Sequence, residues 1–461
     1  MAASGNASFA AGSFVGRSSL ALRMSRQSEK LPLHDIGFGE SSTPATTMNL
    51  VATMVGAGVL AIPKVYATVG MPMGIAITVV GCGISIYLSD ILSEAIGTVQ
   101  EKSKQRMRTL EDVGGACYGS MGRMITSFII NGTFIGKTAV YFVLIGQSLA
   151  FLRSPPMYRG WVLIGGAAFM ASAFVRRVAT LEKIVFLGVV SSVAFLVMIM
   201  IGSLEAHSLN FAEGTDFLKV SSIDSTQLFP ALSVLLFSFG PTDVLATVRN
   251  NMRDQSGMRH ALVVSHVLVG IFCILAGVLG FWGFGSEVSD DITQVMCGSA
   301  PGADCSKEPK WLSGYLLAGA VVLNLGSTIP VDLYCLFSNI EASFAPDESM
   351  SRFANVALRL GVVLFCVVIG LLLPFFMEVL EIFCAVMIVP GVIWLPLAFA
   401  RKASLDCGRP NSAARSAFDA MLFILGLASL VLGLYSSVHE LVEAFQANEE
   451  GAANPFAVRW F

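Results

Sequence analysis

Apolar segments long enough to cross a bilayer dominate the sequence and recur from residue 46 to residue 438. A transmembrane helix needs about 20 mainly apolar residues to span the hydrocarbon. Only 13% of the 461 residues are charged, whereas soluble domains carry roughly 25%. The mean hydropathy is +0.72. These features predict an all-α integral membrane protein that is embedded in a lipid bilayer.

Charge-rich breaks separate the apolar runs into eleven candidate spans. They lie near 46–67, 71–99, 121–152, 160–175, 184–204, 225–249, 260–285, 311–340, 357–376, 378–400 and 417–438. The segment 160–175 is short for a span. The segments 357–376 and 378–400 are too long together for one helix, so a tight hairpin is expected between them.

Basic residues alternate between the loops as the positive-inside rule describes. With the N-terminus inside, most of the 29 Lys and Arg residues fall in inside segments. This alternation predicts a cytoplasmic N-terminus and a C-terminal tail, 441–461, that is extracellular or lumenal. Residues 1–45 are rich in Ser, Gly and Ala, which predicts a disordered cytoplasmic tail; a transit peptide has a similar composition. Residues 46–440 form the predicted transmembrane domain.

Two cysteines differ from the others because they fall in a predicted outside loop. Cys297 and Cys305 both lie between the seventh and eighth spans. Because disulfides form in oxidising compartments, we expect these two residues to pair.

The first and sixth spans are each interrupted near the middle. The first carries Gly56, Gly58 and Pro63, and the sixth carries Gly240-Pro241 beside Asp243. Helix breaks at membrane depth are tolerated where they line a cavity or a ligand site. Interrupted helices at corresponding positions of two halves are typical of inverted-repeat transporters, although close helix packing at small residues is the alternative explanation.

Three stretches in this order resemble the amino acid/auxin permease family. They are Asn49–Pro63, Phe229–Phe239 and Gly280–Gly285, and the resemblance covers about residues 45–440. It implies a LeuT-like fold of two inverted five-helix repeats, in which the first and sixth helices are broken. It also implies transport of amino acids, most often neutral ones, across a plasma, vacuolar or lysosomal membrane.

The resemblance places the substrate against the two breaks. Backbone amides at the start of a half-helix suit an α-carboxylate, and backbone carbonyls at the end of another suit an α-ammonium. The side chains expected to set selectivity are aromatic, although ordinary packing explains any one of them. The predicted residues are Gly56, Ala57, Gly58 and Val59 for the carboxylate, Phe237, Ser238, Phe239 and Gly240 for the ammonium, and Phe134, Tyr141 and Phe239 for the side chain.

Lys137 is a basic residue deep inside the third span, where an ammonium needs a partner. The candidate partners are Asp243, Asp332, Glu378 and Glu381. The family resemblance does not supply this lysine. Two interpretations stay open: a site that favours anionic side chains, and a structural ion pair.

The coupling ion is expected to be Na⁺ or H⁺, with no other cofactor and no metal site. Asn324, Ser327 and Thr328 lie on one face of the eighth span, and in LeuT-like folds that face meets carbonyls near Ala52 and Val55, which would form a sodium site. The alternative explanation for these residues is hydrogen bonding between helices. For protons, His266 and Asp243 are the candidates, because histidine titrates in the useful range.

The leading hypothesis is a secondary transporter that moves amino acids by alternating access. A transporter of another solute, such as a polyamine or an auxin-like acid, and an amino-acid sensor are the alternatives. An enzyme or a primary pump is disfavoured, since the sequence has no nucleophile elbow, HExxH motif or phosphate loop. The net charge of −3 gives no footprint for nucleic acid, and no motif identifies a protein partner.

Overall fold

The computed structural model describes residues 41–105, 107–150, 158–174, 179–212, 227–285, 288, 292, 312–344, 351–372, 376–408 and 411–449. In its described part, each of the eleven predicted spans is helical apart from the breaks in the first and the sixth. The helices are α2 (Thr43–Met54), α3 (Ala57–Val69), α4 (Met71–Ser103), α5 (Leu110–Ala150), α6 (Tyr158–Met170), α7 (Ala179–Ala212), α8 (Leu228–Phe239), α9 (Thr242–Asn251), α10 (Met258–Phe284), α12 (Leu312–Phe344), α13 (Arg352–Leu372), α14 (Phe376–Phe383), α15 (Leu395–Asp406) and α16 (Ala413–Glu449).

Nine helical stretches among the described residues are long and apolar enough to cross a membrane, and α2 with α3 forms a tenth, bent span. The fourth predicted span is α6, which has 13 residues and continues into a short 3₁₀ turn at Ala171–Phe174. Large apolar side chains are exposed on the outer faces, for example Val80, Phe128 and Ile424. Such outward apolar surface suits contact with lipid rather than water.

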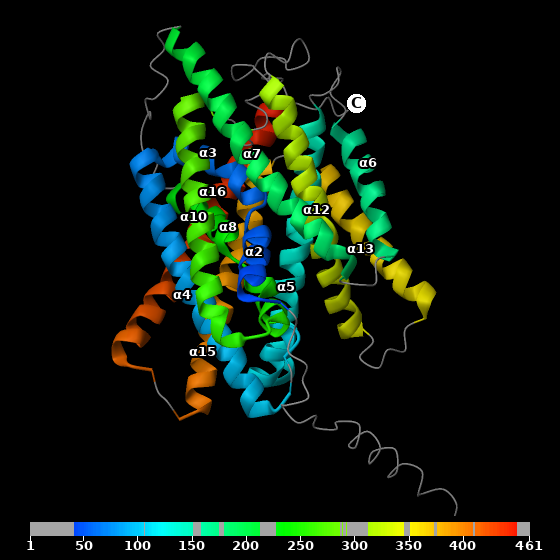
Figure 1. Cartoon of the computed structure of the whole chain (residues 1–461), viewed down its shortest axis with the longest axis vertical. Helices are drawn as coiled ribbons and strands as arrows, with labels where there is room; N and C mark the ends of the chain where they lie inside the picture. Colours follow the sequence, from blue (N-terminus) through cyan, green and yellow to red (C-terminus); the bar gives the residue numbers. More distant parts are fainter. Residues whose placement is uncertain are drawn as a thin grey trace, which may run out of the picture.

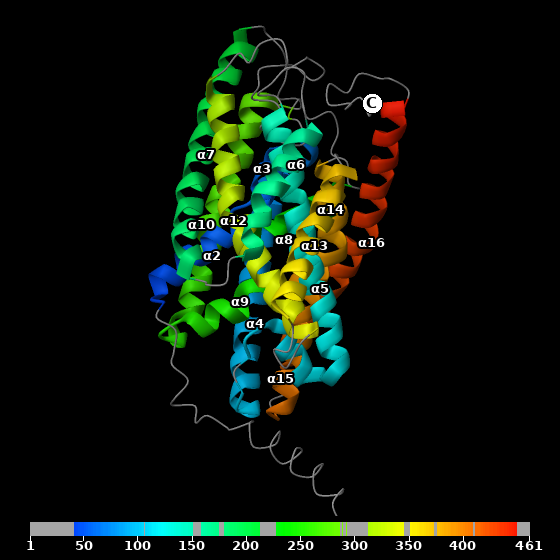
Figure 2. The same ribbon diagram turned by 90° about the vertical axis from the view of Figure 1, so that its right-hand side faces the viewer.

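The broken sixth span, α8 and α9, lies inside the bundle. Every described α8 residue from Pro230 to Phe239 is buried, and α8 packs against α3, α4 and α16 (Figures 1 and 2). On the other side of the molecule, α7 packs against α10 and α12. By contrast, α16 runs along one edge of the bundle (Figure 2).

Basic residues that the sequence assigns to the inside lie at the ends of α4 and α15. These two ends are at the same end of the molecule (Figures 1 and 2). They are joined by an ion pair, in which Lys102 Nζ lies 3.1 Å from Asp406 Oδ2. Their position at one end of the molecule agrees with the predicted assignment of both segments to the same side of the membrane. Which side of the membrane this is stays a prediction.

The third span is longer than its apolar run suggests. Its helix begins at Leu110, eleven residues before the predicted start, and bends at Gly119, where φ is 69°. Glycine adopts this positive φ without the steric cost that other residues carry. Residues 110–120 lie outside the predicted span 121–152, because the uninterrupted apolar run begins only after them.

Candidate functional site

The first break lies between α2 and α3. The two helices meet at 59°, and Val55 and Gly56 between them are not helical. A Cβ atom on Gly56 would lie 3.0 Å from the Tyr141 hydroxyl oxygen of α5. Glycine at this position therefore allows Tyr141 to reach the broken backbone.

The second break lies between α8 and α9. It consists of Gly240 and Pro241, and proline has no backbone N–H to continue the helix. The Gly240 amide donates to the Phe237 carbonyl at 3.5 Å. The span is interrupted as the sequence predicts, yet it continues across the membrane as one stretch from Leu228 to Asn251.

The two breaks touch each other. A Cβ atom on Gly58, in the first turn of α3, would lie 2.3 Å from Ser238 Oγ and 2.9 Å from Phe237 Cδ1. Only a residue without a side chain fits here without displacing α8. The first amides of a helix lack their usual acceptor within that helix, and here the Val59 amide donates to the Gly56 carbonyl at 3.2 Å. The start of α3 lies beside the end of α8, and the binding of a substrate between them stays a prediction.

The tenth span contributes an irregular wall that the sequence analysis missed. Between α14 and α15 the chain forms two π-helical turns, Cys384–Ile388 and Pro390–Trp394. A Cβ atom on Gly240 would lie 2.6 Å from Val392 Cγ2 of the second turn. The prolines at 390 and 396 are the only sequence signal for this irregularity, and π-turns are frequent at functional sites.

Lys137 and Asp243 form a buried ion pair. Lys137 Nζ lies 2.6 Å from Asp243 Oδ2, and the two side chains are 7% and 3% exposed. The structure thus selects one of the four predicted partners. The pair ties α5 to the start of α9, three residues beyond Gly240.

A second carboxyl group faces this pair from α12. Asp332 is 4% exposed and interacts electrostatically with Lys137, Asp243 and Tyr141. Among the described residues, its Oδ2 atom has no hydrogen-bond partner. Asp332 is therefore not the partner of Lys137 but a separate acidic group beside the pair.

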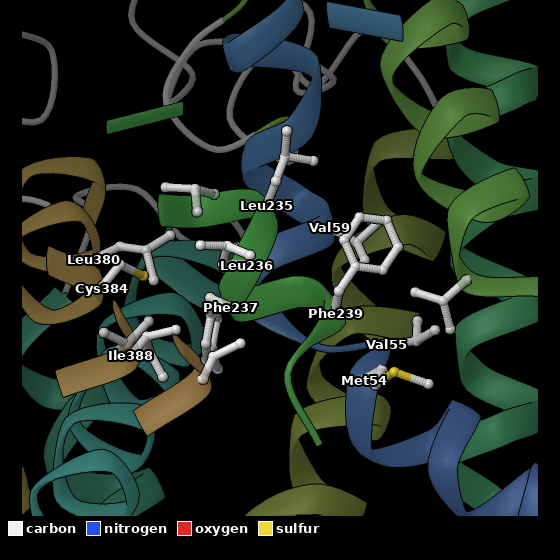
Figure 3. Close-up of a cluster of buried hydrophobic side chains, with 14 of the residues drawn as sticks. Met54, Val55, Val59, Leu235, Leu236, Phe237, Phe239, Leu380, Cys384 and Ile388 are labelled. Carbon is white, nitrogen blue, oxygen red and sulfur yellow. The ribbon is translucent and has the colours of Figure 1, made fainter. Parts of the chain in front are cut away.

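Two of the predicted aromatic residues lie near the ion pair, and a third does not. The centroids of the Phe134 and Phe237 rings lie 6.0 and 5.9 Å from Lys137 Nζ. Phe239 lies on the other side of α8, facing Val55 and Val59 (Figure 3), and it approaches Gly270 of α10. Phe239 thus packs away from Lys137.

An apolar cluster covers the space around both breaks. Figure 3 shows Phe237 beside Cys384 and Ile388 of the first π-turn. The Phe237 ring also meets Phe383 edge to face, with 5.8 Å between the ring centroids. Lys137 and Asp243 are likewise buried, and a buried environment strengthens the electrostatic interaction between them.

The predicted sodium ligands of α12 have partners in α7 and in α12 itself. The Asn324 side-chain amide donates to the Gly188 carbonyl at 3.1 Å and to Ser192 Oγ at 2.7 Å. The hydroxyls of Ser327 and Thr328 donate to the Asn324 carbonyl at 2.6 and 3.0 Å. The cage that would join these residues to carbonyls of Ala52 and Val55 stays a prediction.

His266 lies in α10, away from the charged residues. It is fully buried. Its Nδ1 donates to the Leu262 carbonyl at 2.7 Å, and its Nε2 lies 3.5 Å from Ser89 Oγ. The His266 ring also hydrogen-bonds the backbone of Phe239 at the end of α8, so this histidine contacts the second break, and its role in proton coupling stays a prediction.

Three predicted positions are not described in full. Cys297 and Cys305 lie outside the described residues, so their pairing stays a prediction. The backbone of Ala57 begins α3, but its side chain is not described. Over the part of the chain that the structure describes, no group of three or more His, Cys, Asp and Glu side chains is placed to hold a metal ion.

Comparisons of the sequence give a consistent family. The model of a family described as "transmembrane amino acid transporter protein" matches residues 39–439. The vesicular GABA transporter of Caenorhabditis elegans is 21% identical over 434 residues, which cover 90% of this chain and 83% of the relative. The amino acid transporter AVT6A of Arabidopsis thaliana is 24% identical over 364 residues, covering 74% of this chain and 75% of the relative.

Comparisons of the structure give the fold. A Na⁺-coupled sialic acid symporter in a substrate-bound outward-open state matches with a TM-score of 0.52 and 13% identity, covering 91% of this chain and 95% of that one. MhsT in complex with L-phenylalanine matches with a TM-score of 0.56 and 16% identity, covering 87% of this chain and 99% of that one. Both have the LeuT fold, so the predicted fold class is confirmed.

Proposed function

Since this chain belongs to the family of transmembrane amino acid transporter proteins, we propose that it is a secondary transporter which moves amino acids across a membrane by alternating access. The substrate binds between the breaks of the first and sixth spans. A coupling ion, H⁺ or Na⁺, supplies the driving force. As the family resemblance implies, the N-terminus lies in the cytoplasm and the membrane is the plasma, vacuolar or lysosomal membrane.

The observation that carries this proposal is the contact between the two breaks. Gly58 lies against Ser238 and Phe237, and Tyr141 reaches the broken backbone at Gly56. Amides at the start of α3 suit the α-carboxylate of an amino acid, because the positive end of the helix dipole favours negative charge. Carbonyls at the end of α8 suit its α-ammonium, since that end of a helix has unsatisfied acceptors.

Alternating access follows from the same geometry. Transporters with discontinuous helices expose a central site to each side in turn by rocking or gating one part of the bundle against the other around that site. In this protein the breaks at Gly56 and Gly240 are the proposed pivots. The buried ion pair of Lys137 and Asp243 links the moving α9 to α5.

The proposal is tested by uptake into liposomes. The purified full chain is reconstituted, and uptake of a labelled amino-acid mixture is measured with sodium and proton gradients imposed separately. Accumulation driven by either gradient supports secondary transport and identifies the ion. Binding of amino acids without flux under any gradient would contradict the proposal and favour a sensor.

A variant of the first break sharpens this test. Tyr141→Phe removes the hydroxyl that lies against Gly56, so we expect the apparent affinity for amino acids to fall while the fold is kept. Gly83→Ala is the matched control, because a Cβ atom there would meet no other atom within 4 Å. Equal uptake by the two variants would argue that the first break is not the substrate site.

A further inference from the structure

Three ionisable side chains converge beside the proposed substrate site, one from each of three elements. They are Lys137 of α5, Asp243 of α9 and Asp332 of α12. Ionisable groups inside membrane spans are costly and mark functional sites by default. The family resemblance leads us to expect neutral side chains in the substrate, and it offers no reason for this cluster.

The cluster holds one cation and two acidic groups. Lys137 and Asp243 satisfy each other at 2.6 Å. Asp332 has no such partner among the described residues, for its Oδ2 atom is buried without a hydrogen bond. A buried carboxylate without a counter-charge costs several kcal/mol, so Asp332 requires a further positive charge or a proton.

The three ionisable residues lie next to the place where the backbone of the substrate amino acid is proposed to bind. Tyr141 lies one helical turn after Lys137 on the same face of α5, and its hydroxyl reaches Gly56. Asp243 lies in the first turn of α9, two residues after Pro241 of the second break. Asp332 interacts electrostatically with both Tyr141 and Asp243, so it is the carboxyl group that a substrate side chain placed beside these two residues would meet.

We propose that Asp332 binds the cationic side chain of the transported amino acid, so that the protein carries lysine-like and arginine-like substrates. This inference rests on the proposed function. An ammonium or guanidinium group supplies the positive charge that Asp332 lacks, and a charged hydrogen bond forms without disturbing the Lys137–Asp243 pair. Because Asp332 is buried, little water competes for its carboxylate.

The surroundings of Asp332 favour a cation over an anion. The titratable groups near it are Lys137 and Tyr141 of α5, Asp243 of α9 and Cys335 of α12 itself. The one positive charge in this set is already paired with Asp243.

The other side-chain classes fit less well. An acidic side chain would meet the repulsion of two carboxylates, and Lys137 would have to leave Asp243 to bind it. A neutral side chain would supply no positive charge to Asp332, so the carboxyl group would have to bind a proton instead. The proposal therefore predicts that cationic amino acids are preferred over both acidic and neutral ones.

The test compares substrates in liposomes that contain the full-length protein. Uptake of labelled L-lysine and L-leucine is measured over a range of concentrations, with unlabelled L-arginine and L-glutamate as competitors. We expect the half-saturating concentration of lysine to be at least about 10-fold below that of leucine, because a hydrogen bond to a charged group is worth this factor or more. Arginine competes and glutamate does not.

Variants of Asp332 then identify the group responsible. Asp332→Asn is expected to raise the half-saturating concentration of lysine about 10- to 100-fold and to leave that of leucine unchanged or lower. Asp332→Glu keeps the charge and retains the preference for lysine. Glu111→Gln removes another buried carboxyl group, at the opposite end of α5, and changes neither value.

Several outcomes would overturn the proposal. Equal uptake of lysine and leucine by the unmodified protein does so even if Asp332→Asn fails to fold. A proportional loss of both substrates in Asp332→Asn, together with a loss of proton dependence, would make Asp332 a proton carrier instead. If the unmodified protein transports none of the amino acids, the proposed function fails as well, and this outcome is distinct from transport without the cationic preference.

Discussion

The buried ion pair between α5 and α9 gives the most direct test of the site's electrostatics. Asp243→Asn keeps the shape of the side chain and the acceptor oxygen that caps the Val244 amide at 3.1 Å, but it removes the charge facing Lys137. At the observed 2.6 Å separation, Coulomb attraction is about 6 kcal/mol for an effective dielectric constant of about 20. Desolvation of the two ions offsets most of this gain, so the intact pair adds little net stability.

Breaking the pair is different, because it removes the carboxylate in contact with the Lys137 ammonium and leaves only the electrostatic interaction with Asp332. We expect Asp243→Asn to destabilise the protein by about 3–5 kcal/mol. The double variant Lys137→Met/Asp243→Asn removes both charges and should regain more than half of that loss. The assay is the apparent melting midpoint in detergent, followed by size-exclusion chromatography of the heated samples.

Two results of the double-variant cycle would refute the proposed role of the ion pair. The cycle also needs the single variant Lys137→Met. If the stability losses of Lys137→Met and Asp243→Asn simply add in the double variant, the two side chains do not act as a pair. If Asp243→Asn melts at the same temperature as the unmodified protein, Lys137 is not held as a buried cation by Asp243. The Gly83→Ala variant, at a position with open space around it, shows the scatter of the assay.

Three further predictions concern neighbouring parts of the site. Gly58→Ala places a methyl group 2.3 Å from Ser238 Oγ; we expect a loss of about 1–3 kcal/mol from overpacking and a loss of uptake that Gly83→Ala does not share. Thr328→Ala is expected to raise the sodium concentration needed for uptake, and sodium-independent uptake by the unmodified protein would rule out the predicted sodium cage. Tyr66→Phe deletes a buried 3.0 Å hydrogen bond between α3 and α4, which should cost about 1 kcal/mol in the melting assay without changing substrate selectivity.

Spans and helix breaks could be predicted from the sequence because both depend on local composition. Runs of apolar residues determine where a helix can lie in lipid. Gly56 and the Gly240-Pro241 pair destabilise a helix whatever its neighbours are. The polar start of α5 could not be predicted in this way. Its helix begins at Leu110 and turns at Gly119, outside the apolar run, so hydropathy gave no signal for it.

The π-turns of the tenth span show a second limit. Pro390 and Pro396 indicate an irregular helix, but they do not indicate where the extra residues are accommodated. That depends on α8, which packs against the first π-turn, and on Gly240, which packs against Val392 of the second. Contacts between segments about 150 residues apart in the chain are not encoded in either segment alone.

The partner of Lys137 illustrates why the sequence reduced the choice to four carboxyl groups and no further. Helix periodicity puts Lys137 at a known depth, but the rotation of each neighbouring helix determines which acidic residue faces it. Gly136 lets the Phe383 ring approach so closely that a Cβ atom there would lie 2.1 Å from it. The tenth span thus presents an aromatic ring to α5 beside Lys137, while Glu381 accepts a 3.0 Å hydrogen bond from Ser437 of α16. With that carboxyl group turned toward α16, the ammonium pairs with α9, and Asp332 is left as the acidic group that the transported substrate is proposed to neutralise.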